Sequence, residues 1–479
     1  MDNTDETILQ SEQQTALHPT IFVIFGITGD LASRKLLPAL LSLYSKGMLP
    51  KRFSIIGFSR RPFSREEFRD FIRSKLNIRF GQFREEDVKH FLDHIIYVRG
   101  LFDQVDSYRL LAAKLTEVDK SWGQCSNKLF HLSVPPDLYE GILHKLHDSK
   151  LATPCSDETG WSRILIEKPF GNDTKTAQSL DALLAKLFKE KQIFRIDHYL
   201  AKESLQNILA FRFSNSMFEP VWNAKYIDRI HIKLFESGGM NGRGKFYDSL
   251  GAIRDVGQNH MLMMLALVAM DKPESLSSGD IRTARARVLK KLEAISPRSL
   301  VDKVTRGQYI GYISEEGVAP DSKTETYVRM EAKLALSRWK NVPFYIETGK
   351  ATAETKTEID VYFKNTENKK YEHDPIKQNI LTFRIQPDEG IKIRFFVKTP
   401  GNGLRTEAKT LKFRYSDVPS FGMIPDDYER LINDVFIGDQ TLFASTDEIM
   451  ASWKFITPIL EHWNKLPLKK YSKGAIEVE

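Results

Sequence analysis

The fold is decided by residues Ile21–Ala32, which read IFVIFGITGDLA. Five apolar residues end at Gly26, and helical spacing begins at Leu31. A short buried strand, a glycine turn and a helix, in this order, are typical of the first unit of a dinucleotide-binding domain. Gly26 would form the tight turn, Gly29 would let the backbone approach a diphosphate, and Ala32 would let the helix pack closely on the strand. Glycines between strand and helix often mark only a tight connection, but the matching strand and helix favour a cofactor site.

Strands and helices keep alternating up to about residue 197. Pro38 lies inside the first helical segment, Leu31–Lys46, and predicts a kink or an early break there. Short buried strands separated by helices predict an α/β domain, a parallel, doubly wound sheet of the Rossmann type with helices on both faces. The expected strands are Ile21–Phe25, Phe53–Phe58, Ile95–Val98, Lys128–Val134 and Arg163–Glu167, and the further helices are Arg65–Leu76, Tyr108–Val118, Leu138–His147 and Thr174–Glu190.

From about residue 198 the pattern changes to alternation of polar and apolar residues, as in RIHIKL at 229–234. This period is typical of half-buried antiparallel strands and predicts an α+β domain, a large, mostly antiparallel sheet with helices on one face. We therefore expect a disordered tail over residues 1–19, a Rossmann domain over 20–197 and a second domain over 198–479. The further strands are expected at Glu358–Lys364, Asn379–Gln386 and Ile391–Lys398, and the helices at Ile253–Met270, Gly279–Ile295 and Asp447–Leu460.

The charge balance favours anionic partners. The 479 residues include 70 Lys and Arg against 63 Asp and Glu, a formal net charge of +7. The densest basic segments, residues 51–61 and 465–473, lack the interleaved aromatic residues of a single-strand binding groove, so we expect no nucleic acid partner. The most apolar stretch, Met261–Met270, is only half of the ~20 residues that cross a membrane, so we expect no membrane partner.

The N-terminus and the cysteines favour a cytoplasmic protein. The first 17 residues are polar and acidic, unlike a secretory or transit signal. Two cysteines, Cys125 and Cys155, are too few for a disulfide framework in a chain of this length, and neither has the local features of a nucleophile. Histidine pairs with helical spacing lack a third ligand, so we expect no metal.

The second strand indicates which dinucleotide binds. NAD enzymes usually place an acidic residue there for the ribose hydroxyls, whereas here Arg60 and Arg61 follow the strand. Guanidinium groups suit the 2′-phosphate of NADP, and Arg60 is the stronger candidate because Arg61 could be a solvated side chain. The segment Gly239–Lys245 has the spacing of a nucleotide-triphosphate loop, but Phe246 replaces the magnesium-binding Ser or Thr, which argues against an ATPase.

Two further segments carry candidate site residues. Lys168, in the sequence EKPFG, follows a predicted strand at the sheet edge where ligands collect, and the following Pro169 suits a fixed turn, for which a cis bond is one option. Residues 195–203 read RIDHYLAKE. A helix beginning near Tyr199 would bring His198 and Lys202 onto one face, and two cations with a phenol would suit a phosphate dianion. A capped helix with a charged surface would explain only part of this cluster.

The chain resembles the glucose-6-phosphate dehydrogenase family. The resemblance rests on IFGITGDLASRKLLPAL, EKPFG, RIDHYLAKE and IRDVGQNH, and is extended by NGRGKFYDSLG, GKATAETK, FRIQP and YERLINDVF. These motifs run in order from about Ile21 to Pro458. The resemblance implies transfer of hydride from C1 of β-D-glucose 6-phosphate to NADP, giving 6-phospho-D-glucono-1,5-lactone in the first step of the oxidative pentose phosphate pathway. It also implies a homodimer or homotetramer in which the second domain binds substrate and forms the oligomer.

The resemblance assigns roles to single residues. His260 would be the base that takes the C1 hydroxyl proton, and Asp197 would orient its imidazole. Out of context, a histidine before an apolar helix would more often be a satisfied helix residue. The expected cofactor residues are Gly26, Thr28, Gly29, Asp30, Leu31, Arg60 and Lys168. The expected substrate residues are Lys168, His198, Tyr199, Lys202, Glu236, Asp255 and Lys350.

The chain departs from the family pattern at three positions. Thr355 stands where the family commonly has a second basic residue after Lys350, and the adjacent Lys356 could point the other way. Ala201 replaces a glycine. Asp360 stands where animal enzymes have an arginine for a second, structural NADP, so we expect none. Because of Thr355, a dehydrogenase of another hexose 6-phosphate is an alternative, and a catalytically weak regulator that binds sugar phosphate or nucleotide is a second one.

Overall fold

The computed structural model describes residues 18–77, 83–156, 160–365, 378–403, 405–422, 424–476 and 478. The chain forms two units. Unit 1 contains the residues up to Phe170, Gln178–His198 and Pro425–Ala444, and unit 2 contains Gly171–Ala177, Tyr199–Ile424 and Ser445–Glu479. Residues 1–17 of the expected tail lie outside the described residues.

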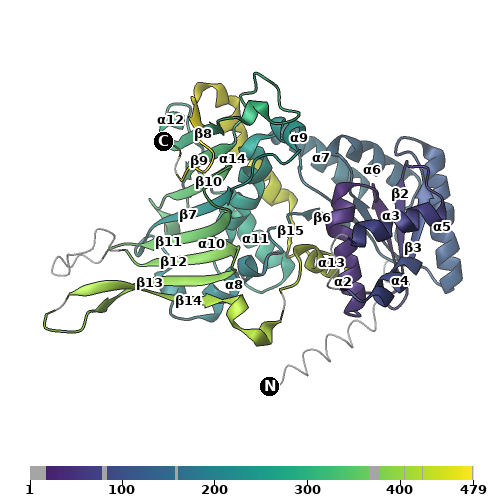
Figure 1. The fold of residues 1–479 in the computed structure, drawn as a ribbon, viewed down its shortest axis with the longest axis horizontal. Helices are drawn as coiled ribbons and strands as arrows, with labels where there is room; N and C mark the ends of the chain where they lie inside the picture. The colour runs from purple at the N-terminus through teal and green to yellow at the C-terminus, as the bar shows by residue number, and fades with distance from the viewer. Residues whose placement is uncertain are drawn as a thin grey trace. The chain divides into compact units, whose positions relative to one another are not determined.

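Unit 1 is built on a seven-stranded sheet with the order β15-β6-β5-β4-β1-β2-β3 (Figure 1). All neighbours pair in parallel except β15 with β6, which confirms the predicted doubly wound sheet. The central strands consist almost entirely of buried residues, because helices cover both faces of a parallel sheet. The strands are β1 (Thr20–Phe25), β2 (Phe53–Ser59), β3 (Ile95–Arg99), β4 (Asn127–Leu132), β5 (Ser162–Ile166), β6 (Ile193–Ile196) and β15 (Phe443–Ala444).

The helices of unit 1 match the predicted ones and add two. They are the π-helical η1 (Ala32–Leu36), α2 (Leu37–Ser45), α3 (Arg65–Asn77), α4 (Glu85–Asp93), α5 (Val105–Trp122), α6 (Tyr139–Asp148) and α13 (Asp427–Ile437), with most of α7 (Thr174–Leu187). The sequence analysis missed α4 and α13. The predicted break at Pro38 is a change of helix type, because the π-helical segment ends just before it and Pro38 lies in the first turn of α2.

The strand β6 was also missed, because its four residues IFRI contain a charge. Arg195 is only 2% exposed, and ion pairs with Asp181 and Glu190 satisfy its guanidinium group. A buried arginine of this kind is tolerated only when its charge is paired. The buried charge in the strand therefore depends on partners that lie outside the strand itself, 5 and 14 residues earlier in the chain.

Unit 2 contains a nine-stranded sheet with the order β14-β13-β12-β11-β7-β10-β9-β8-β16. The sheet is mostly antiparallel, as predicted, but β7 pairs in parallel with β10 and β16 in parallel with β8. Helices cover one face of the sheet, as Figure 1 shows for α8 and α10. The strands are β7 (Ile227–Glu236), β8 (Val304–Tyr309), β9 (Tyr327–Ala332), β10 (Phe344–Lys350), β11 (Lys356–Phe363), β12 (Ile380–Gln386), β13 (Gly390–Lys398), β14 (Thr406–Arg414) and β16 (Leu468–Tyr471).

Two of the three helices predicted for unit 2 differ in the structure, and two short helices, at Gly244–Asp248 and Leu300–Lys303, are not predicted. The expected helix Ile253–Met270 is a π-helical segment, η5 (Ile253–Met261), followed by α10 (Leu262–Ala269). The expected helix to Ile295 stops at Leu289, because residues 291–293 form backbone hydrogen bonds with residues 333–335 instead. The helices are α8 (Glu203–Ser214), α9 (Gly244–Asp248), α10, α11 (Ser278–Leu289), α12 (Leu300–Lys303) and α14 (Thr446–Glu461).

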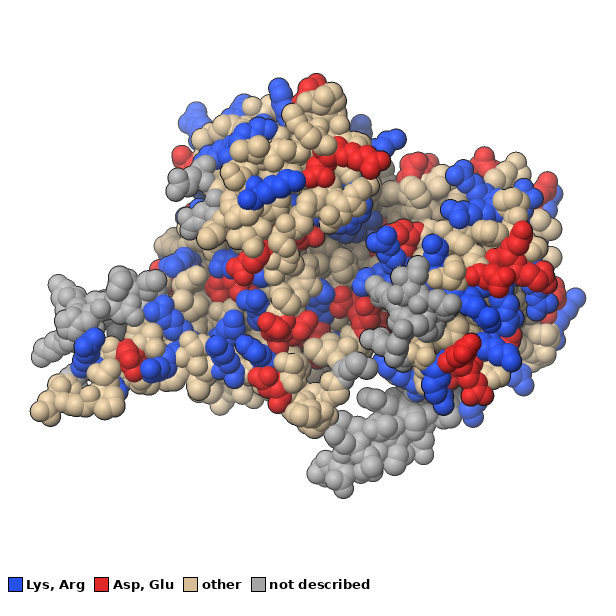
Figure 2. All heavy atoms as spheres, in the orientation of Figure 1, with Lys and Arg blue, Asp and Glu red and all other residues tan. Residues whose placement is uncertain are grey.

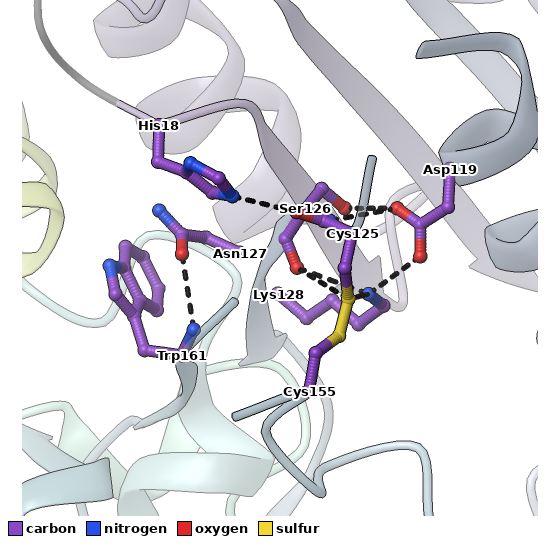
Figure 3. Close-up of a disulfide and its surroundings, with 8 residues drawn as sticks. All are labelled: His18, Asp119, Cys125, Ser126, Asn127, Lys128, Cys155 and Trp161. Carbon is purple, nitrogen blue, oxygen red and sulfur yellow. Dashed lines mark hydrogen bonds and ion pairs between the residues drawn. A yellow bond between two sulfur atoms is a disulfide. The ribbon is translucent and has the colours of Figure 1, made fainter. Parts of the chain in front are cut away.

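The two cysteines form a disulfide, which the sequence analysis did not expect. Cys125 precedes β4 and Cys155 precedes β5, with their Cα atoms 6.5 Å apart (Figure 3). Next to the bond, the Asp119 carboxylate accepts hydrogen bonds from Lys128 Nζ at 2.9 Å and from the Ser126 backbone at 3.1 Å. The disulfide therefore joins the amino ends of two neighbouring parallel strands, at the edge opposite the carboxyl ends where ligands collect.

Charged side chains of both signs are mixed on the face of the protein shown in Figure 2. Lysine and arginine side chains there alternate with aspartate and glutamate and do not form one continuous basic surface. Within the described residues, no helix is both long enough and apolar enough to cross a membrane.

Candidate functional site

A cavity of about 610 Å³ lies at the carboxyl ends of β1, β2 and β4 in unit 1. Gly26 ends β1 with φ +77°, and a Cβ atom there would lie 2.3 Å from the Ser133 carbonyl oxygen. Only glycine fits this turn, as the sequence predicts. Gly29 N–H donates to the Gly26 carbonyl at 2.8 Å, and Thr28 Oγ1 lies 3.0 Å from Ser59 Oγ at the end of β2. Gly26, Thr28 and Gly29 all line the cavity, so the backbone is open to a ligand there.

The predicted arginines border this cavity. Arg60 and Arg61 are both exposed, and both line it. Arg61 also lines an adjacent cavity of about 460 Å³ together with Asp30, Phe71 and Lys75. Its guanidinium carbon lies 5.8 Å from the centre of the Phe71 ring, and its carbonyl accepts a hydrogen bond from Tyr97. Arg61, which the sequence analysis ranked second, is therefore held by contacts at both ends.

The cavity residues fit a dinucleotide phosphate. β2 ends in Ser59 and carries no acidic residue, and Lys145 adds a third cation to the lining. Asp103 and Asp137 line the cavity from other loops. The other predicted cofactor residues lie at the start of the first helix: Asp30 is exposed and paired with Arg34 at 2.7 Å, and Leu31 is half-buried.

Lys168 is half-exposed two residues after Ile166, the last residue of β5, at the sheet edge where it is predicted. The Lys168–Pro169 peptide bond is cis, which the sequence analysis suggested. Asp197 and His198 follow the end of β6, and Asp197 is 2% exposed. Three of the predicted residues of unit 1 therefore stand at carboxyl ends of neighbouring parallel strands, where side chains from different strands converge.

In unit 2, the structure brings Tyr199, Lys202 and His260 together. The rings of Tyr199 and His260 stack with centroids 4.3 Å apart, and Lys202 Nζ lies 5.2 Å from the centre of the Tyr199 ring. Tyr199 and His260 are 7% and 1% exposed. Gln386 Nε2 donates to the Tyr199 hydroxyl at 3.2 Å, a contact that the sequence analysis missed because Gln386 comes from the distant strand β12.

The local structure of this segment differs from the prediction. α8 begins at Glu203 and not near Tyr199, and Lys202 is its N-cap residue with extended backbone angles. Residues 199–202 form a turn that the Lys202 N–H closes onto the Tyr199 carbonyl at 3.0 Å. The prediction that His198 and Lys202 lie on one face of a helix is therefore wrong, although Lys202 still lies beside the Tyr199 ring.

A second cluster in unit 2 contains Glu236, Lys350 and Asp255. Lys350 Nζ forms an ion pair with the Glu236 carboxylate and lies 5.2 Å from the centre of the Tyr247 ring. Burial raises the pKa of the Tyr247 phenol well above its ordinary value, and the nearby Asp255 carboxylate adds to this rise. The parallel pairing of β7 with β10 places Glu236 opposite Lys350. Asp255 and His260 both belong to η5, so one element carries residues of both clusters.

The departure at Thr355 has a structural counterpart. Thr355 Oγ1 accepts a hydrogen bond from the Ser237 N–H at 2.9 Å and lies 2.8 Å from Ser237 Oγ. Lys356 forms ion pairs with Glu354 and Glu358, so its charge does not replace the missing basic group. The Asp360 carboxylate pairs with Lys233 Nζ at 2.7 Å.

Comparisons with known proteins show the family of this chain. The family models for the NAD binding domain and the C-terminal domain of glucose-6-phosphate dehydrogenase match residues 23–207 and 209–478. The glucose-6-phosphate 1-dehydrogenase of Chlamydia muridarum is 39% identical over 471 residues, covering 94% of this chain and 92% of that protein. The enzyme of the same name from Aggregatibacter actinomycetemcomitans is 40% identical over 451 residues, covering 92% of this chain and 90% of that protein.

Solved structures extend the similarity to the fold. A glucose-6-phosphate dehydrogenase in complex with its substrate glucose 6-phosphate matches with a TM-score of 0.88 and 34% identity, covering 97% of this chain and 96% of that chain. Glucose-6-phosphate 1-dehydrogenase from Mycobacterium avium matches with a TM-score of 0.82 and 30% identity, covering 95% of both chains. On two family models, full-length relatives and a shared fold, this chain belongs to the glucose-6-phosphate dehydrogenase family.

Proposed function

We propose that this protein oxidises β-D-glucose 6-phosphate at C1 to 6-phospho-D-glucono-1,5-lactone, with NADP as the hydride acceptor. The observation that carries the proposal is the cluster of Tyr199, Lys202 and His260 in a chain whose relatives are glucose-6-phosphate 1-dehydrogenases along nearly their whole length. A cation and a phenol beside a buried imidazole provide a phosphate site next to a proton acceptor.

His260 would hold the proton of the C1 hydroxyl as the hydride leaves. A base must take this proton because the carbonyl of the lactone forms as the C1–H bond breaks. Tyr199 fixes the plane of the imidazole from one side, and the buried setting keeps water from competing for the proton. Asp197 would orient the imidazole, as the family resemblance implies.

The remaining substrate contacts follow from charge. Lys202, His198 and Tyr199 would bind the 6-phosphate dianion, since charge-assisted hydrogen bonds to phosphate are strong. Glu236 and Asp255 would accept hydrogen bonds from the sugar hydroxyls. Lys350 forms an ion pair with Glu236 and neutralises its charge. Lys168 would lie between sugar and cofactor.

NADP is the proposed cofactor because Arg60 and Arg61 stand at the end of β2, where NAD enzymes usually place a carboxylate. The 2′-phosphate would lie against these guanidinium groups, and the diphosphate against the turn from Gly26 to Gly29. A homodimer or homotetramer also belongs to the proposal, as does a cytoplasmic location. The cysteines no longer support that location, because they form a disulfide, a bond that is rare in cytosolic proteins.

The test is reduced-cofactor absorbance with glucose 6-phosphate or free glucose, each combined with NADP or NAD. We expect rapid turnover only with NADP and the phosphorylated sugar. Turnover with another hexose 6-phosphate but not with glucose 6-phosphate would support the alternative that Thr355 suggests, a dehydrogenase with a different hexose 6-phosphate as its substrate. Binding of NADP or of the sugar phosphate without turnover would support a regulatory relative.

A further inference from the structure

Glu167, the residue directly before Lys168, is held at both its side chain and its backbone. Its Oε1 lies 3.2 Å from His131 Nε2 and accepts a hydrogen bond from the Tyr428 hydroxyl at 3.0 Å. Its backbone carbonyl accepts a hydrogen bond from the Tyr139 hydroxyl at 3.0 Å. In the tautomer that carries its proton on Nε2, His131 donates to this carboxylate, because carboxylate oxygens accept hydrogen bonds.

The three partners come from three separate elements of unit 1. His131 lies on β4, which pairs in parallel with β5 and ends beside it. Tyr139 begins α6 and Tyr428 lies in the first turn of α13. They are only 0%, 2% and 5% exposed. Burial and the nearby Glu167 carboxylate raise the pKa of both tyrosines, so both remain protonated donors at any ordinary assay pH.

The hydrogen bonds to Glu167 are not needed to hold the end of strand β5 in the sheet. The backbone ladder already fixes β5 up to Ile166. The Glu167 side chain is only 12% exposed, and a polar group removed from water to this degree costs free energy unless it is hydrogen-bonded. These hydrogen bonds also restrict the next residue. Because the carbonyl and the side chain of Glu167 are fixed, the Lys168 backbone has little conformational freedom. A displacement of about 1 Å at a site residue can cost ~10²-fold in rate.

We infer that Glu167 is the positioning residue for Lys168, held in place by His131 and Tyr428. The inference rests on the proposed function only for the role of Lys168. Glu167 itself does not touch the substrate in this account. It acts by fixing the direction in which Lys168 leaves the sheet.

The decisive experiment combines Glu167→Gln with Lys168→Ala and measures kcat and KM of the wild type, both single variants and the double variant. If Glu167 acts through Lys168, Glu167→Gln alone lowers kcat/KM by ~10–100-fold but adds almost nothing once Lys168 is Ala. Losses that multiply in the double variant would overturn the inference, because they would mean that Glu167 supports the site or the fold independently of Lys168.

The partners of Glu167 give a second, milder series. His131→Phe removes the donor, whereas His131→Gln keeps an amide N–H of similar reach and should restore most of the lost kcat/KM. Tyr428→Phe removes a single hydroxyl and keeps the ring, so it should fold and lower kcat/KM by ~3–10-fold. Equal activity of His131→Phe and His131→Gln would contradict the role of the hydrogen bond.

Asp119→Asn is the matched structural control. This carboxylate also accepts hydrogen bonds, from Ser126 and Lys128, but at the opposite end of β4. The substitution should lower the thermal midpoint without changing kcat or KM. If the wild type does not oxidise glucose 6-phosphate with either dinucleotide, the proposed function fails. The same double-variant cycle is then measured by calorimetry as the dissociation constant of NADP, and multiplicative losses there overturn the inference separately.

Discussion

The imidazole of His260 lies nearly flat against the phenol ring of Tyr199, with an angle of 27° between the ring planes and 4.3 Å between their centroids. The tyrosine is itself fixed, since its hydroxyl accepts a hydrogen bond from Gln386 Nε2. Such packing would favour proton transfer from the substrate to His260, because the imidazole already has the required rotamer before the substrate binds.

Replacing His260 by Asn should lower kcat by ~10²–10⁴-fold with little change in KM, because the amide cannot accept the hydroxyl proton. Steady-state kinetics with glucose 6-phosphate and NADP measure both constants. Tyr199→Phe is the control, since it keeps the stacked ring and loses only the hydroxyl. It should mainly raise KM for the sugar phosphate. A large rise of KM at intact kcat in His260→Asn would argue against a proton acceptor.

Lys202→Ala should raise KM for the phosphorylated sugar by ~10-fold or more and leave kcat largely intact, because a lost charge-assisted contact to phosphate weakens binding. The preference for glucose 6-phosphate over free glucose should shrink by the same factor. Lys225→Ala is a matched control, since this lysine also lies 5.2 Å from a tyrosine ring, that of Tyr226, but is outside the cluster. Unchanged discrimination against free glucose in Lys202→Ala would refute the phosphate site.

Arg60→Ala and Arg61→Ala should each weaken NADP binding far more than NAD binding, because only NADP carries the 2′-phosphate. Titration of both dinucleotides by calorimetry gives the two dissociation constants of each variant, which are compared with those of the wild type. The ring of Phe71 lies beside Arg61, so Phe71→Leu should produce a smaller loss of the same kind. Arg52→Ala, in the same basic segment but with its guanidinium on the Trp122 carbonyl, should change neither constant. Equal losses for NADP and NAD would exclude a role in binding the 2′-phosphate.

The features that the sequence predicted well are local. The turn at Gly26 is predicted by one apolar strand followed by a glycine. The structure requires glycine there because a Cβ atom would collide with the Ser133 carbonyl oxygen. Likewise, the alternation in RIHIKL predicts β7 because each residue's own polarity decides which face of the sheet it occupies. In both cases the signal lies within a few residues of the feature.

The features that the sequence did not predict depend on distant partners. Pairing direction is one case, since alternation is the same in parallel and antiparallel strands and β7 has one neighbour of each kind. The start of α8 is another, because residues 199–202 prefer a turn to the helix that their spacing allows. The disulfide is a third, because its cysteines lie 30 residues apart and meet only when β4 and β5 pair.

The disulfide gives a stability prediction for unit 1. Closing a loop of 30 residues removes conformational freedom from the unfolded chain and should stabilise the protein by about 3–4 kcal/mol. Cys125→Ser, or reduction of the wild type, should therefore lower the thermal midpoint measured by calorimetry. Reductant should have no effect on the variant lacking both cysteines. Detection of two free thiols in the native, unreduced protein would contradict the bond.

Asp434 lies in the helix α13. Burial raises the pKa of its carboxyl group from 3.8 to about 7, and the nearby Asp439 adds to the rise. Between about pH 4 and pH 7 the folded protein therefore binds a proton that the unfolded chain has released, so this group stabilises the fold at low pH and its contribution is lost as the pH rises toward 7.

Asp434→Asn removes this dependence, because the amide stays neutral at every pH. Relative to the wild type, the variant should gain on the order of 2–4 kcal/mol of stability between pH 4.5 and pH 8.5. Urea unfolding midpoints of both proteins across this range measure the gain. Asp106→Asn, at a highly exposed carboxylate that pairs with Arg109, should show no comparable trend. A constant difference between wild type and Asp434→Asn at all pH values would mean that the carboxyl group titrates normally, because a shifted pKa must appear as a slope in stability against pH.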